Sequence, residues 1–83
     1  MSEETKQVLL SDLLTHEQLD EVERILNTTE DRMDASNKLR RYLAQFKTEL
    51  EAKGVVSDYL AYLIAYKQWT GGDNGDRVVS LSV

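Results

Sequence analysis

The 83-residue sequence contains no cysteine and no proline, and all four of its glycines lie between Gly54 and Gly75. Without cysteine the chain forms no disulfide and offers no thiol nucleophile, a composition typical of the reducing cytoplasm. Without proline or glycine nothing interrupts residues 1–53, which favours helices joined by short polar turns. A chain this short forms one domain, so stability must come from well-packed helices, self-association or a partner.

Long hydrophobic runs are also absent. The most apolar stretch, residues 55–66, contains Asp58 and is too short to span a bilayer. The first six residues are polar and acidic, unlike a secretory signal. We therefore expect a cytoplasmic protein without membrane contact.

Positive charge is scarce in the first part of the chain. Residues 1–36 hold ten acidic and three basic residues, whereas residues 37–56 hold five basic and two acidic ones, within a net charge of −5. This distribution suits intramolecular pairing or a charged partner, and it does not suit a general nucleic-acid binder. The acidic first part also leaves open DNA mimicry by an inhibitor of a nucleic-acid enzyme.

Apolar spacing predicts helices in the first half of the chain. Acidic residues followed by four leucines predict a first helix over Glu3–Leu14. Thr15-His16-Glu17-Gln18 has the pattern of a capping box and predicts the start of a second helix that ends near Asn27. Its expected core face consists of Leu19, Val22, Ile25 and Leu26.

A third helix is predicted to start after Thr28 or Thr29 and to run to Lys53, with Gly54 as its left-handed cap. Its apolar residues fall within an arc of roughly 100°, the width of a core-facing stripe. The residues of this stripe are Ala35, Leu39, Tyr42, Leu43, Phe46 and Leu50.

A fourth helix, predicted over Asp58–Thr70, is apolar nearly all round. Leu60, Leu63 and Ile64 share one side, which we expect to face the third helix. The sequence thus predicts an all-α fold, a small bundle of three to four helices in residues 1–70. Residues 71–83 are predicted to form a flexible or strand-like C-terminal tail, with no strand to pair with.

Few residues suggest chemistry. His16 and Asp20 have a metal-chelating spacing but no second histidine, and Asp73–Asp76 resembles the start of a calcium loop that has no twelfth ligand. Adjacent carboxylates such as Glu3/Glu4 are expected on solvent faces, outside any cleft that would shift their pKa. We therefore predict no metal, no cofactor and no enzymatic activity.

The strongest functional signal is aromatic. Tyrosine and tryptophan combine a large contact area with a polar edge, and they are enriched at protein interfaces. The alternative is that a small bundle uses these side chains as core, with the hydroxyl groups reaching its rim. The sequence predicts a non-catalytic interaction protein, an adaptor, inhibitor or regulator, whose partner is another protein or a second copy of itself. A homo-oligomeric structural component and a nucleic-acid-binding or nucleic-acid-mimicking regulator are the alternatives. The predicted partner-binding residues are Tyr59, Tyr62, Tyr66 and Trp69.

Overall fold

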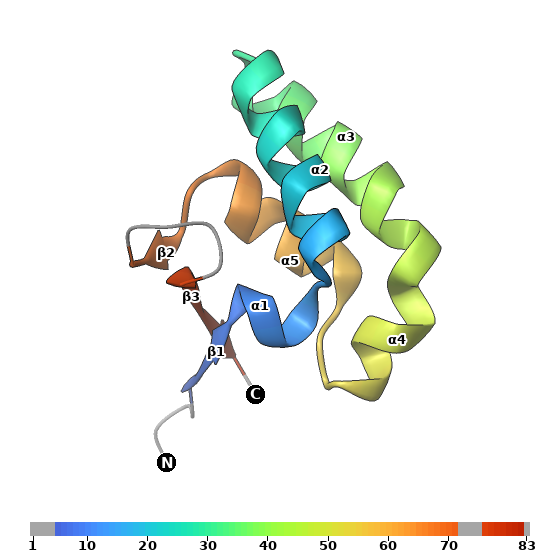
Figure 1. Ribbon diagram of the computed structural model, residues 1–83, viewed down its shortest axis with the longest axis vertical. Helices are drawn as coiled ribbons and strands as arrows, with labels where there is room; N and C mark the ends of the chain where they lie inside the picture. The colour runs from blue at the N-terminus through green and yellow to red at the C-terminus, as the bar shows by residue number, and fades with distance from the viewer. Residues whose placement is uncertain (1–4, 72–75, 83) are drawn as a thin grey trace.

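The computed structural model describes residues 5–71 and 76–82, and it combines a layer of helices with a small antiparallel sheet (Figure 1). The chain is mostly helical, as predicted. The prediction of an all-α fold is correct only in part, because the two ends of the described chain pair as strands. The elements are, in order, β1 (Thr5–Leu9), α1 (Leu10–Leu13), α2 (His16–Thr28), α3 (Arg32–Leu43), the 3₁₀ turn η1 (Ala44–Phe46), α4 (Lys47–Ala52), α5 (Ser57–Ala65), β2 (Trp69–Thr70) and β3 (Val78–Ser82).

The start of α2 confirms the predicted capping box. The hydroxyl of Thr15 accepts a hydrogen bond from the backbone N–H of Gln18 at 3.2 Å, and the Gln18 side chain accepts one from the N–H of Thr15 at 2.8 Å. Two of the backbone donors at this helix end are thereby satisfied. Of the four predicted core residues, Leu19, Val22 and Ile25 are buried, and Leu26 is partly buried. Figure 1 shows α2 beside α3, with α5 behind them.

The third predicted helix is interrupted. The chain leaves α-helical geometry at η1 and resumes it in α4, so one continuous helix to Lys53 was wrong. Most of the predicted stripe is nonetheless buried, as Leu39, Leu43 and Leu50 show. Phe46 lies at the interruption and is half-buried, with its ring edge-on to that of Tyr42 at 5.4 Å. Gly54 follows α4 with φ +82°, the left-handed conformation predicted for it.

The prediction of a first helix over Glu3–Leu14 was also wrong. Residues 3 and 4 of that range lie outside the described part of the chain. Thr5–Leu9 forms β1, and only Leu10–Leu13 is helical. The leucine spacing is a local signal, whereas β1 is formed by a contact with the far end of the chain. Val8 lies opposite Val79 of β3, and the N–H of Leu10 donates to the carbonyl of Arg77 at 2.8 Å.

The sheet has the order β1-β3-β2, so the last strand in sequence lies in the middle. The prediction that the C-terminal segment has no strand to pair with was wrong, because β3 pairs with both β1 and β2. The predicted boundary at residue 70 falls between two strands of this sheet. Val79 and Leu81 of β3 are buried against the helices. Residues 73–75 of the possible calcium loop lie outside the described residues.

Candidate partner-binding surface

Helix α5 buries one side and exposes another. Leu60 and Ile64 are fully buried, as expected for the side that packs against α3. Tyr59, Tyr62 and Tyr66 lie on the opposite side and are 40%, 48% and 38% exposed. Exposed large apolar side chains that gather in one place are typical of contact sites.

These three tyrosines form a continuous row, called here the tyrosine ridge. The ring centroids of Tyr59 and Tyr62 are 6.5 Å apart with nearly parallel planes, and those of Tyr62 and Tyr66 are 4.9 Å apart. Spacings of three and four residues bring side chains together on one helix face. The ridge therefore presents pre-ordered aromatic surface along α5.

Trp69 does not lie on this helix face. The prediction that placed Trp69 on the same helix as the three tyrosines was therefore wrong. Trp69 lies in β2 and is half-buried. The guanidinium of Arg77 stacks on its ring, 4.2 Å from the centroid. Arg77 is buried and also bonds to Glu23 of α2, with nitrogen–oxygen distances of 3.0 and 3.3 Å. Trp69 and Arg77 thus join the sheet to α2.

The cause of this difference is a turn that ends α5 at Ala65. The N–H of Lys67 donates to Ile64 at 3.1 Å, and the N–H of Gln68 donates to Leu63 at 2.8 Å. These two bonds define a Schellman motif, whose left-handed residue is usually glycine. Here it is Lys67, with φ +54°. No glycine marks this helix end in the sequence, which explains why the helix was predicted to reach Thr70.

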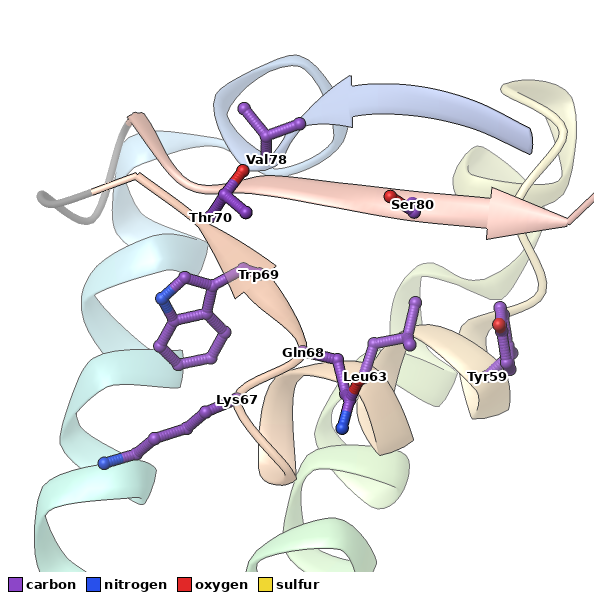
Figure 2. A pocket seen from close by; sticks show the side chains of 8 residues that line it. All are labelled: Tyr59, Leu63, Lys67, Gln68, Trp69, Thr70, Val78 and Ser80. Carbon is purple, nitrogen blue, oxygen red and sulfur yellow. The ribbon is translucent and has the colours of Figure 1, made fainter.

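A groove, called here the α5 groove, lies between the sheet on one side and α5 with the turn that follows it on the other, with a volume of about 480 Å³ (Figure 2). Tyr59 and Trp69 both line it, at opposite ends (Figure 2), whereas Tyr62 and Tyr66 do not. Apolar, hydroxyl and amide groups share its walls, and Lys67 is its charged lining residue. Its lining consists of Tyr59, Leu63, Lys67, Gln68, Trp69, Thr70, Val78 and Ser80.

Most of the groove lining was not predicted. Lys67, Gln68 and Thr70 were assigned to a continuous helix, and Val78 and Ser80 to a tail. The strand-like composition of residues 77–83 was the available signal, but the sequence pattern did not identify a pairing partner. Only the fold brings these residues into one groove with Tyr59.

Other candidate residues are arranged as solvent-exposed groups. The His16 Nε2 and Asp20 Oδ2 atoms are 3.7 Å apart, and both side chains are exposed. Among the described residues no three histidine, aspartate or glutamate side chains gather as a metal site. Hydrogen bonding and charge from Arg24 hold the pKa of Glu21 below its ordinary value of 4.5. A surface ion pair explains that shift.

No protein-family model, curated protein or solved structure significantly matches this chain. Within residues 5–71 and 76–82, no helix has the length and apolar character needed to cross a membrane.

Proposed function

We propose that this chain is a non-catalytic interaction module that docks a partner protein through the tyrosine ridge and the adjoining α5 groove. The observation that carries the proposal is the exposed, mutually packed row Tyr59, Tyr62 and Tyr66. Tyrosines in such a row lose little side-chain freedom on binding, and each adds a hydroxyl that bonds at a wet interface rim. An adaptor, an inhibitor or a regulator fits this description, and the cytoplasm is the compartment proposed from the sequence.

The α5 groove supports a docking role because it adjoins the ridge at Tyr59. A partner that covers the ridge also has a concave site into which one of its own side chains fits. Interfaces of this kind concentrate binding energy where an aromatic anchor and a pocket lie together. Tyr59 therefore joins the two parts of one proposed surface.

Site-specific photo-crosslinking in the source cell tests this proposal. A photoreactive phenylalanine analogue is placed at Tyr62 or Tyr66, and separately at Met33, which is 64% exposed on α3. We expect the same discrete adduct from Tyr62 and Tyr66 and no such adduct from Met33. Mass spectrometry then identifies the crosslinked protein.

Loss of that adduct when Tyr59→Ser is introduced into the same chain would show that the groove end of the tyrosine ridge belongs to the same contact. Adducts that are equally strong at Met33, or absent from both tyrosine positions, contradict the proposal. An adduct with a second copy of the chain favours the homo-oligomeric alternative. Adducts with nucleic acid favour the third hypothesis.

A further inference from the structure

Within residues 5–71 and 76–82, strand β1 lies at the edge of the sheet and pairs with β3 alone. In an antiparallel pair, opposite residues alternate between those that exchange backbone hydrogen bonds and those that do not. Leu10 and Arg77 are the next opposite residues after the Leu9–Val78 pair, and the N–H of Leu10 donates to the Arg77 carbonyl, so they form a hydrogen-bonded pair. Because hydrogen-bonded pairs recur at every second residue, Val8 and Lys6 also direct their backbone groups toward β3. The backbone N–H and C=O of Gln7, in the middle of β1, therefore point away from the sheet.

The outward edge of β1 is self-complementary. When a second copy approaches antiparallel with Gln7 opposite Gln7, the two residues form a pair that exchanges two backbone hydrogen bonds. In the same register Lys6 lies opposite Val8 of the other copy. Like charges directly across a strand pair are unfavourable, and this register avoids them, since Lys6 is the single charged residue of β1.

Among the described residues, no element covers this edge of β1. A hollow of about 490 Å³ lies beside it, with Val8, Leu9 and Leu13 as its apolar lining. Leu9 is 38% exposed. Lys53 also lines the hollow, but its ammonium donates to the backbone carbonyls of Asp12 and Leu13, at 3.2 and 3.3 Å. Natural proteins protect free strand edges with charged side chains, prolines, bulges, very short strands or a covering element; of the residue types in that set, β1 carries Lys6 alone and no proline.

We propose that β1 pairs antiparallel with β1 of a second copy, so that two three-stranded sheets join into one continuous sheet. The contact uses β1 and its hollow, whereas the proposed partner surface uses α5, so the two proposals stand or fall separately. An edge of five residues is about 17 Å long. Because so short a contact buries little area, the dimer is expected to be weak and to form in the micromolar to millimolar range.

Sedimentation equilibrium of the full chain over that concentration range is the first measurement. We expect a reversible monomer–dimer equilibrium. Gln7→Pro removes an N–H that points away from β3, so the β1–β3 hydrogen bonds remain while the outer edge is blocked. This variant should shift the dissociation constant upward at least tenfold. Gln7→Thr keeps the backbone donor and is the matched control, expected to dimerise as the unmodified chain does.

A second measurement does not depend on any variant folding. In a sample that mixes isotope-labelled and unlabelled chains, the proposed register places the Hα atoms of Lys6 and of Val8 from the other copy close together, which gives an intermolecular nuclear Overhauser effect. A chain that stays monomeric at millimolar concentration overturns the proposal, as does a dimer that lacks this signal. A dimer that survives Gln7→Pro but dissociates in Tyr62→Ser plus Tyr66→Ser also overturns it, and assigns self-association to the tyrosine ridge.

Discussion

The helical layer and the sheet are held together in different ways. In the helical layer, α2, α3 and α5 bury a shared set of large side chains, including Val22, Leu39 and Ile64. The sheet joins residues 5–9 to residues 78–82, and its main buried contributions are Val79 and Leu81. The helical layer is thus formed by packing between segments close in sequence, whereas the sheet closes nearly the whole chain into a loop.

This difference predicts unequal local stability. Closing a long loop costs conformational entropy that local contacts do not incur. A short sheet forms few backbone hydrogen bonds, so these bonds offset only a small part of that entropy. Regions with few buried apolar contacts open at lower free energy than the rest of a protein. We therefore expect the sheet to open first, with α2–α5 remaining folded, and the following substitutions test that order.

The largest effect is expected in the helical layer. Leu43 is fully buried, so Leu43→Asp places an unpaired charge in the core. The expected cost is several kcal/mol, comparable with the whole stability of a small domain. Circular dichroism should show loss of the helical spectrum, while the surface control Glu21→Ala should melt normally. A cooperative melt for Leu43→Asp near that of the parent would remove Leu43 from the core.

A smaller effect is expected in the sheet. Arg77→Ala removes the bonds to Glu23 and the stacking on Trp69, which connect β3 and β2 to α2. We expect destabilisation of roughly 1–3 kcal/mol, the range for losing a hydrogen-bonded charged group. Hydrogen exchange should increase in β1 and β3 before it increases in α2 and α3. Uniform loss of protection across both layers would instead show that the sheet and helices unfold as one unit.

The turn at Gly54 is a Schellman motif like the one at Lys67, since the N–H of Val55 donates to the carbonyl of Leu50 at 2.9 Å. Substitutions at these two left-handed residues should change the unfolding free energy in opposite directions. Gly54→Ala adds a methyl group that meets no atom within 4 Å, so its cost comes from φ +82° alone. Lys67→Gly relieves the same kind of strain at φ +54°. Each change should alter the unfolding free energy by about 1 kcal/mol, Gly54→Ala downward and Lys67→Gly upward. Urea titrations measure both; a loss of stability in Lys67→Gly would mean that the lysine side chain itself stabilises the turn.

The smallest effect concerns the surface of α2. Arg24 lowers the pKa of Glu21, so the pair contributes stability above the ordinary glutamate pKa of 4.5 and loses it as pH falls through the lowered pKa. Arg24→Ala should raise the pKa of Glu21 toward its ordinary value, as measured by carboxyl NMR titration. Because both groups are exposed, the melting temperature should hardly change. An unchanged pKa would show that the pair is not formed in solution.

Prediction from sequence succeeded where a local pattern has a local cause. The capping box at Thr15, the buried residues of α2 and the cap at Gly54 follow from interactions within a few residues. It failed at Lys67, which adopts a glycine conformation without being glycine, and at Thr5–Leu9, where leucine spacing favoured a helix. Tyr62 and Tyr66 are exposed, in line with the surface expected for them, whereas Trp69, expected on the same surface, is half-buried in β2. The role of these residues in binding stays a prediction.

The sequence by itself determined the mostly helical character, the start of α2, and the division of α5 into a buried aliphatic side and an exposed tyrosine side. These features depend on helical periodicity and on hydrogen bonds between near neighbours. Only the tertiary structure decided that the two ends of the chain form strands, that Trp69 lies under Arg77, and that Tyr59 lines a groove beside β3. The reason is physical: a strand is stable only when another strand satisfies its backbone groups, and that strand lies at the opposite end of the chain.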